Sequence, residues 1–342
     1  MEKFPVTVLM PVYNAEKYLA AAMESILQQT FQDFEFLIVD DASTDASASI
    51  IFSYNDTRIK YVKNERNMGI TLTLNRGIEM AIGKFIARMD ADDISYPERL
   101  QKQVKYLENH PQSAMVSSAA NVVTENGELI YTDTTPSEFY YFKLTFTSPF
   151  FHSSVMYRKE HVIAAGLYSV PYAEDFELFW RLARTASFYN LPEVLLDYRV
   201  SGQSLFHATK KKEYADEVNK QCLRNIRFYA GANYLVKESH LQCFQYEYDL
   251  LLKENNVGSI IQCLQTLDQI TAYIIEMPNI NRDVESIYDA AKEKKVDIIS
   301  YFVRKLPYYK RVLLMARLNQ FAEIKEMVSK TVLKRLFKKS IN

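Results

Sequence analysis

Residues 34–45 read FEFLIVDDASTD, and this stretch decides how the first part of the chain folds. Its first six residues form a near-continuous apolar run, which is typical of a strand buried on both faces of a sheet. A turn and helix cap follow at Asp41–Thr44. A similar apolar run, VTVLMP at residues 6–11, lies before it, and residues 18–30 between the two runs carry apolar side chains at helical spacing.

The same alternation continues as far as residue 90. It predicts a helix to about residue 53, a strand at 59–62, a helix at 71–82 and a strand at 85–89. Strands that alternate with helices imply right-handed crossovers and an α/β fold with a mainly parallel sheet. Ligands of such sheets bind beyond the carboxyl ends of the strands, so we expect the chemistry at residues 11–14, 40–45 and 90–93.

The later elements are less regular. The sequence predicts a helix at 98–109, strands at 114–118, 152–157 and 194–200, a hairpin turn at Asn126-Gly127 and an acidic helix start near 172–184. Beyond about residue 210 strand signals are few, and helices are expected to the end. We therefore predict a catalytic domain at 1–208 and an all-helical C-terminal domain at 209–342.

Composition excludes several classes of protein. The chain has 342 residues, 48% of them hydrophobic, which is unlike a disordered protein. Its three cysteines, at 222, 243 and 263, form no CxxC pair, so we expect core thiols in a reducing compartment. No GxGxxG motif supports a dinucleotide site. The polar start and the lack of an apolar run of about 18 residues predict a cytoplasmic protein.

The near-neutral net charge of −1 conceals a segregation. The segment 304–342 carries eleven Lys or Arg and two Glu, about +9, which leaves about −10 for residues 1–303. The acidic body offers no basic face, so no nucleic-acid partner is predicted.

Asp90-Ala91-Asp92, with Asp93 after it, stands at the predicted end of the fourth strand. Hard cations such as Mn²⁺ or Mg²⁺ are bound by one or two carboxylates together with phosphate oxygens, which a nucleotide diphosphate supplies. A DxD pair also occurs by chance in many chains. The alternative is therefore that these acids only cap a helix.

Four stretches together resemble family 2 glycosyltransferases of the GT-A fold. They cover roughly residues 5–200 and read VTVLMPVYNAEKYL; ESILQQTFQDFEFLIVDDASTD; NMG with LNRGIEMAIGKFIARMDADDISYPERL; and AEDFELFWRL. The resemblance implies an inverting, metal-dependent transfer of a sugar from a nucleotide sugar, for which a UDP-sugar is expected. It does not indicate which sugar is moved.

The resemblance also implies a nucleotide pocket. Pro11, Tyr13 and Glu16 should line it, although Tyr13 could instead anchor the turn. Asp41 would accept the N3–H of uracil, a contact that cytidine lacks, while Asp40 would cap the next helix or orient the turn.

Further positions on the donor side follow from the same resemblance. Two of them are arginines, which would bind phosphate or hold an aspartate in position. The alternative for both is a simple surface ion pair. These positions are Arg66, Asn67, Arg88, Asp90 and Ala91.

The expected metal ligand is Asp92, with Asp90 contacting the ribose, the metal or its water. Many relatives carry a histidine soon after a late Tyr-Arg, but here the run is Tyr198-Arg199-Val200-Ser201. His207 would have to substitute as a third ligand, and a surface role is the alternative.

The expected general base is Asp175, supported by Glu174, because AEDFELFWRL resembles the ED motif of the family. The alternative is a pair of carboxylates that stabilise a helix N-terminus. His152 matches a stretch near the acceptor in relatives and is otherwise a packed core histidine.

The C-terminal third resembles no family. An apolar stripe runs along a basic helical segment from Leu314 to Leu336, which predicts either packing, on the catalytic domain or in a homo-oligomer, or docking on an anionic membrane surface. The latter would make the protein peripheral on the inner face of the cell membrane.

The predicted function is thus transfer from a UDP-sugar to a glycan or lipid-linked saccharide in bacterial-type cell-surface polysaccharide synthesis. Two alternatives are a sugar nucleotidyltransferase, which would need a Gly- and Arg-rich loop after the first strand, and a catalytically degenerate scaffold.

Overall fold

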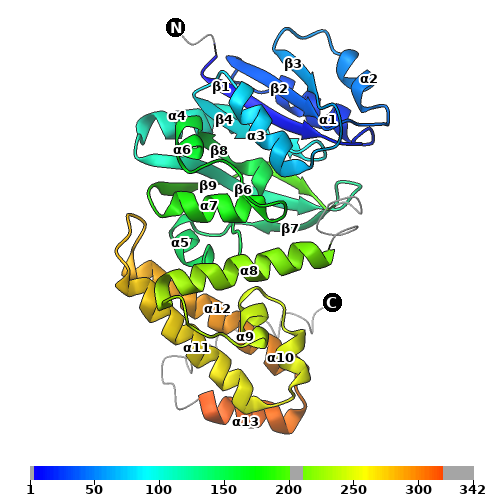
Figure 1. Cartoon of the computed structure of the whole chain (residues 1–342). Helices are drawn as coiled ribbons and strands as arrows, with labels where there is room; N and C mark the ends of the chain where they lie inside the picture. The colour runs from blue at the N-terminus through cyan, green and yellow to red at the C-terminus, as the bar shows by residue number, and fades with distance from the viewer. Residues whose placement is uncertain (1–3, 201–210, 319–342) are drawn as a thin grey trace. The chain divides into compact units, whose positions relative to one another are not determined.

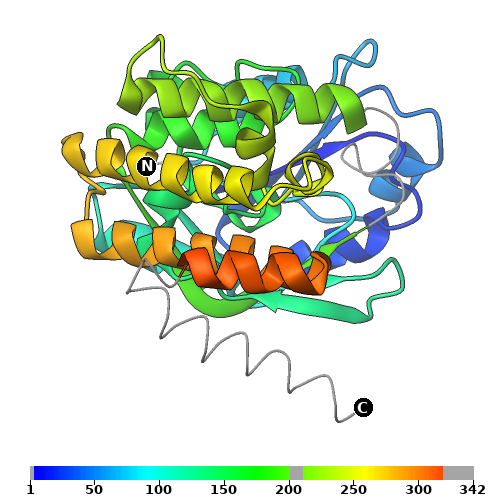
Figure 2. The same ribbon diagram turned by 90° about the horizontal axis from the view of Figure 1, so that it is seen from below.

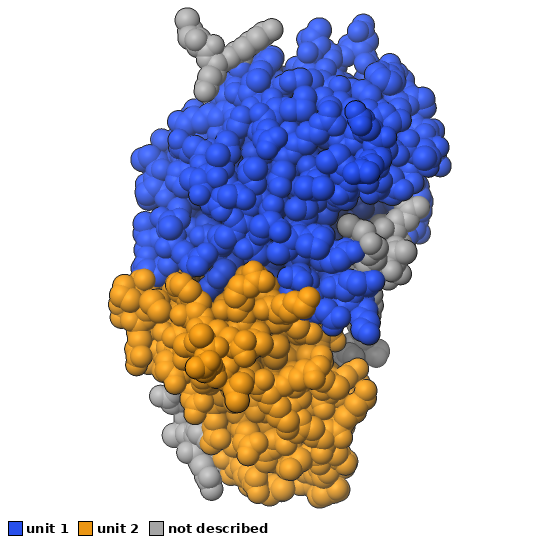
Figure 3. Space-filling model, in the orientation of Figure 1, with its two compact units in different colours: residues 1–140, 148–218, 279–281 blue, residues 141–147, 219–278, 282–342 orange. Residues whose placement is uncertain are grey.

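The computed structural model describes residues 4–200 and 211–318. The chain divides into two compact units (Figure 3). Unit 1 comprises residues 1–140, 148–218 and 279–281, and unit 2 comprises 141–147, 219–278 and 282–342. The predicted domain boundary at 208/209 lies outside the described residues and stays a prediction.

The first half of unit 1 is a parallel sheet in the strand order β3-β2-β1-β4. Its strands are β1 (Val6–Val12), β2 (Phe34–Asp40), β3 (Ile59–Lys63) and β4 (Phe85–Arg88). The helices between them are α1 (Leu19–Leu27), α2 (Ser47–Phe52) and α3 (Ile70–Met80) (Figure 1). The alternation predicted from the sequence is therefore confirmed.

Both faces of this sheet are covered, which explains the uninterrupted apolar runs. Val8 and Met10 pack in one core with Met23 of α1. Leu9 points to the opposite face, where Gly77 lets α3 approach so closely that a Cβ there would collide with the leucine side chain.

The second half of the sheet is mixed. It continues from β4 in the order β8-β6-β9-β5, with β7 paired to β6. The strands are β5 (Ile94–Ser95), β6 (Ser113–Val123), β7 (Leu129–Asp133), β8 (Met156–Arg158) and β9 (Ser187–Arg199). The hairpin at Asn126-Gly127 is confirmed, with Gly127 at a positive φ of 83°.

Shorter elements complete unit 1. Those first met here are α4 (Arg99–Asn109), η1 (Ser137–Phe139), α5 (Tyr140–Lys143), η2 (His152–Ser154), α6 (Lys159–Ala164) and α7 (Glu174–Ala183), with α5 ending in unit 2. The predicted strand at 152–157 is wrong in its first half, because η2 forms a turn in which Ser154 N–H donates to Phe151 O.

The strand order places a topological switch between β1 and β4, because β2 and β3 extend the sheet on one side of β1 and β4 lies on the other. The turns that follow β1, β2 and β4 meet at this edge. This half of the fold therefore brings the three polar segments of the sequence together.

The described residues from 211 onward form helices and no strands. The helices are α8 (Lys211–Ala230), α9 (Glu238–Phe244), α10 (Asp249–Lys253), α11 (Val257–Glu276), α12 (Val284–Lys305) and α13 (Tyr308–Leu318). Cys222, Cys243 and Cys263 are buried free thiols in unit 2, as expected. Among the described helices, none combines the length and apolar character that crossing a bilayer requires.

Candidate active site

The turns after β1 and β2 are fastened to each other. Asn14 Oδ1 accepts the Thr44 N–H at 2.9 Å, and the Asn14 N–H donates to Ser43 Oγ at 3.0 Å. Asn14 has a positive φ of 49°, which asparagine tolerates better than most residues. These contacts fix the two turns as one rigid rim of the site.

Glu16 belongs to the same fastening. Its carboxylate accepts the Ala46 N–H at 2.9 Å, and its own N–H donates to Asp45 Oδ2 at 2.9 Å. Glu16 therefore supports the start of α2, and it is not among the residues that line the cavity described below.

Asp40 and Asp41 have different surroundings. Asp40 is fully buried and accepts the Ser43 N–H at 2.7 Å and the Tyr61 hydroxyl at 2.6 Å, so it orients the turn. Asp41 accepts from Asn64 Nδ2 at 2.7 Å, Met68 N at 2.8 Å and Gly69 N at 2.9 Å. Its Oδ1 receives two of these bonds and its Oδ2 one, which leaves Oδ2 able to accept another donor.

The loop held by Asp41 presents Asn67 and Met68 to the cavity. Arg66, one residue earlier, is exposed and does not contribute to the lining. The chain then enters α3 through Gly69, whose φ of 83° suits glycine.

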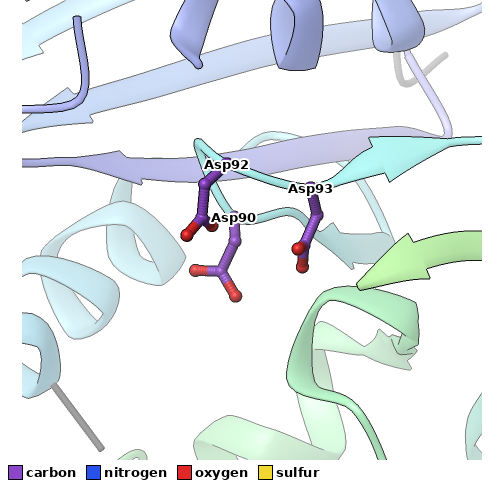
Figure 4. Close-up of side chains that lie close together, drawn as sticks. All are labelled: Asp90, Asp92 and Asp93. Atoms are coloured by element: carbon purple, nitrogen blue, oxygen red, sulfur yellow. The ribbon is translucent and has the colours of Figure 1, made fainter. Parts of the chain in front are cut away.

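Asp90, Asp92 and Asp93 form an acidic cluster on the turn between β4 and β5. Ligand oxygens of the three carboxylates all lie within 4.8 Å of one another. Figure 4 shows the three carboxylates pointing to the same side of the turn. An all-oxygen set of this kind fits Mg²⁺ or Mn²⁺.

Two buried arginines lie behind this cluster. Arg88 is 3% exposed and forms an ion pair with Asp90. Burial lowers the pKa of Arg88, but the attraction of Asp90 outweighs it and the net pKa is raised. Arg99 is fully buried and donates to Ser153 O and to Arg88 O, the latter at 3.1 Å. Both guanidiniums offset part of the negative charge of the cluster.

Asp93 is occupied by protein donors. Its carboxylate accepts the Arg199 N–H at 2.7 Å and the Ser153 hydroxyl. The Arg199 side chain also donates to Asp92 O at 2.8 Å. Asp93 therefore anchors the turn, whereas Asp90 and Asp92 line the cavity described below.

Burial and crowding raise the pKa of two members of the cluster. The pKa of Asp92 rises to about 6, first through burial and then through repulsion by Asp90. The pKa of Asp93 is raised by the same two causes. A bound divalent cation would relieve this repulsion, which is a second sign that the site fits one.

Glu174 and Asp175 open α7, directly after Ala173, which has a positive φ of 51°. Burial, followed by the charge of Asp175, raises the pKa of Glu174 to about 8, and burial raises the pKa of Asp175. Glu174 Oε1 lies 3.6 Å from His152 Nδ1, and His152 Nε2 contacts the Tyr168 hydroxyl at 2.7 Å. His152 is thus a packed histidine behind the ED pair.

The rim, the acidic cluster and the segment before α7 enclose a cavity of about 670 Å³. Small-molecule sites commonly measure roughly 300–1,000 Å³. Seven positions expected from the sequence line it: Pro11, Tyr13, Asp41, Asn67, Asp90, Ala91 and Asp92.

Other expected positions lie elsewhere. Arg88 is buried behind Asp90, and Glu174 and Asp175 follow the lining residues Pro171 and Tyr172 by a few positions. His207 lies outside the described residues. The sequence did not single out Pro171 and Tyr172, although their place just before the ED pair was a usable signal.

Comparison with known proteins shows the family of this chain. The family model for glycosyl transferase family 2 matches residues 7–164. The amylovoran biosynthesis glycosyltransferase AmsE of Erwinia amylovora is 30% identical over 274 residues, 77% of this chain and 93% of AmsE. The chain belongs to glycosyl transferase family 2.

Solved structures show the same fold as this family 2 glycosyltransferase. S. aureus TarS 1-349 in complex with UDP-GlcNAc matches with a TM-score of 0.56 and 18% identity, over 89% of this chain and 93% of that one. The mannosyltransferase PcManGT from Pyrobaculum calidifontis, in complex with GDP-Man and Mn²⁺, matches with a TM-score of 0.52 and 16% identity, over 92% and 80%. The predicted GT-A fold with a helical C-terminal region is confirmed.

Proposed function

We propose that this glycosyltransferase transfers a hexosyl or N-acetylhexosaminyl group from a UDP-sugar to a glycan or lipid-linked saccharide, with inversion at the anomeric carbon. The proposal rests on one observation: the Asp41 carboxylate and the Asp90 and Asp92 carboxylates line the same cavity. A nucleoside diphosphate needs a base contact at one end of its site and charge neutralisation at the other.

The base end would be formed by Tyr13 and Asp41. The Tyr13 ring is 52% exposed and lines the cavity, so it is available to stack on a pyrimidine. Asp41 Oδ2 accepts one N–H bond and can accept a second, from the N3–H of uracil. Cytosine would instead present the lone pair of its N3 to this oxygen. This contact selects uridine.

The diphosphate end would be formed by Asp92 and Asp90, which would hold Mn²⁺ or Mg²⁺. When bound, the cation supplies Lewis-acid neutralisation of the leaving diphosphate. Arg88 would keep Asp90 oriented through their buried ion pair.

Asp175 would act as the general base. It stands in the first turn of α7, just after the residues that line the cavity, and its raised pKa brings it nearer to that of an effective base at neutral pH. Asp175 would take the proton of the acceptor hydroxyl as its oxygen attacks the anomeric carbon opposite the departing UDP. A single displacement of this kind inverts the configuration.

Two comparisons support the substrate class. AmsE is named for amylovoran biosynthesis, and TarS carries UDP-GlcNAc in its structure. We extend both to this chain as a role in cell-surface polysaccharide synthesis of the bacterial type, on the cytoplasmic side of the membrane.

A donor panel tests the proposal. UDP release is measured for UDP-Glc, UDP-Gal, UDP-GlcNAc and UDP-GalNAc, with GDP-Man as the control, with and without Mn²⁺ and with polyprenyl-diphosphate-linked saccharides as acceptors. We expect acceptor-dependent release from a UDP-sugar and a product of opposite anomeric configuration by NMR. Preference for GDP-Man, or retention of configuration, would contradict the proposal.

A further inference from the structure

Among the residues that the structure describes, helix α13 packs on its own unit through one side. Its sequence is YYKRVLLMARL, and it contacts α11 and α12. The buried residues of α13 are Leu314 and Leu318, which are one turn apart. Figure 2 shows α13 alongside α12 at the end of the described chain.

The opposite side of α13 is apolar and exposed. Tyr308 is 80% exposed, Tyr309 67%, Val312 52% and Leu313 43%. Tyr308 and Val312 are four residues apart, as are Tyr309 and Leu313, so the four side chains form two neighbouring rows. We call this surface the α13 face. Isolated exposed apolar residues are ordinary, but a contiguous group on one helix indicates a partner.

The charged residues of α13 and of the segment just before it have a single sign. Arg311 and Arg317 on the helix are exposed, as are Arg304 and Lys305 just before it. Between Arg304 and Leu318 the sequence contains no Asp or Glu. Two cations of the helix also bond to the protein: the Lys310 ammonium group donates to Asn255 Oδ1 at 2.7 Å, and Arg311 Nε donates to Leu306 O at 2.6 Å. An apolar strip with a cationic rim calls for a partner that is apolar inside and anionic at its surface.

We propose that the α13 face docks on an anionic lipid bilayer and lies in the plane of its interface. Eleven helical residues extend only about 16 Å, too short to span a bilayer but suited to lying in its headgroup region. Tyrosine rings favour this depth, and each Lys or Arg near an anionic surface contributes about 1 kcal/mol. A second copy of the chain is disfavoured as the occupant, because two cationic rims would face each other. The proposal does not depend on the proposed substrates.

A tryptophan at position 309 would report insertion of the α13 face directly. The chain has one tryptophan, Trp180, which is 3% exposed and gives a constant background. Tyr309→Trp in the full chain is mixed with phosphatidylcholine vesicles, with or without about one third phosphatidylglycerol, whose acyl chains carry bromine. Leu235→Trp is the matched control, because Leu235 is 83% exposed in unit 2 but lies outside α13.

We expect a blue shift and bromine quenching for Tyr309→Trp with the anionic vesicles, and neither for Leu235→Trp. Adding Arg311→Gln and Arg317→Gln should weaken vesicle binding about 30-fold, from about 1 kcal/mol for each cation. Three results would overturn the proposal: no quenching at position 309, equal quenching at position 235, or equal binding to neutral vesicles. A blue shift that grows with protein concentration in the absence of vesicles would assign the face to self-association instead.

Discussion

Arg199, the last residue of β9, donates its backbone N–H to the Asp93 carboxylate at 2.7 Å. Its side chain donates to Asp92 O at 2.8 Å and to Glu125 O at 2.7 Å. The end of β9, the strand that pairs with β5 just after the cluster, therefore holds the turn that carries the acidic cluster. Arg199 acts here as a positioning residue, through the backbone of Asp92.

Replacement of Arg199 by alanine should weaken cation binding more than folding. The backbone bond to Asp93 survives, but the side-chain bonds to Asp92 O in the acidic turn and to Glu125 O in the β6–β7 hairpin are lost, each worth about 1–3 kcal/mol. We expect the affinity for Mn²⁺ in the presence of UDP to fall by about tenfold or more, measured by calorimetric titration. Lys17→Ala is the control, because Lys17 is an exposed cation that pairs with Glu125 at 2.9 Å and lies 4.8 Å from the centre of the Tyr18 ring. Equal Mn²⁺ affinity in wild type and Arg199→Ala would remove this role.

Asp41→Asn should reduce discrimination between uridine and cytidine diphosphates. An amide in place of the carboxylate can rotate to present a donor to the cytosine N3 lone pair, and it weakens the bonds from the Met68 and Gly69 N–H groups. We expect UDP affinity to fall by about 1–3 kcal/mol and CDP affinity to change less, as measured by titration. Asp45→Asn is the control, because Asp45 sits on the same rim and accepts the N–H groups of Glu16 and Ser47 but is not among the residues that line the cavity. An unchanged ratio of UDP to CDP affinity would mean that Asp41 does not touch the base.

The first half of the fold was accessible from the sequence because its strands are buried on both faces. Runs such as VTVLMP and FEFLIV have sharp polar ends, so β1, β2 and the turns after them follow directly. The later strands are harder. The prediction places the last strand at 194–200, whereas β9 begins at Ser187, because polar residues such as Asn190 are satisfied by a partner strand through Ser117 Oγ at 2.8 Å.

The candidate site divides in the same way. Asp41, Asp90 and Asp92 stand directly after apolar runs, so local pattern was enough to select them. The hold of Arg199 on Asp93 joins residues 106 positions apart, and no local pattern encodes it. The burial of Arg99 could not be predicted from local pattern either, because its partner Ser153 lies in η2, far from α4 in the sequence.

Asp175→Asn should strongly reduce the rate of transfer while leaving donor binding intact. The amide cannot accept the proton of the acceptor hydroxyl, and general-base catalysis contributes about 10²–10⁴ in rate. We expect kcat to fall within that range, with UDP affinity within twofold of wild type. Glu174→Gln is the comparison, because Glu174 is buried beside His152 and its replacement should lower the rate less. Near-normal turnover by Asp175→Asn would assign the base to another group.

The free energy of unfolding should increase as the pH rises from 8 to about 10.5, because the buried Lys294 loses its charge in the folded protein over this interval. Its ammonium group is buried in unit 2, donates to Phe244 O at 2.6 Å and lies 4.0 Å from the centre of the Tyr246 ring. Burial lowers its pKa from 10.5 to about 8, so in this interval the unfolded chain binds more protons than the folded one and the free energy of unfolding increases with pH. The shift corresponds to about 3 kcal/mol at its limit. Below pH 8 the cost of the buried charge is fully present.

Denaturant unfolding of wild type and Lys294→Met at pH 7 and pH 10 tests this. The difference in free energy of unfolding between the two proteins should change by about 2–3 kcal/mol in favour of wild type from pH 7 to pH 10. Lys292→Met, at an exposed position on the same helix, should show no such movement, and a pH-independent difference for Lys294→Met would contradict the assignment.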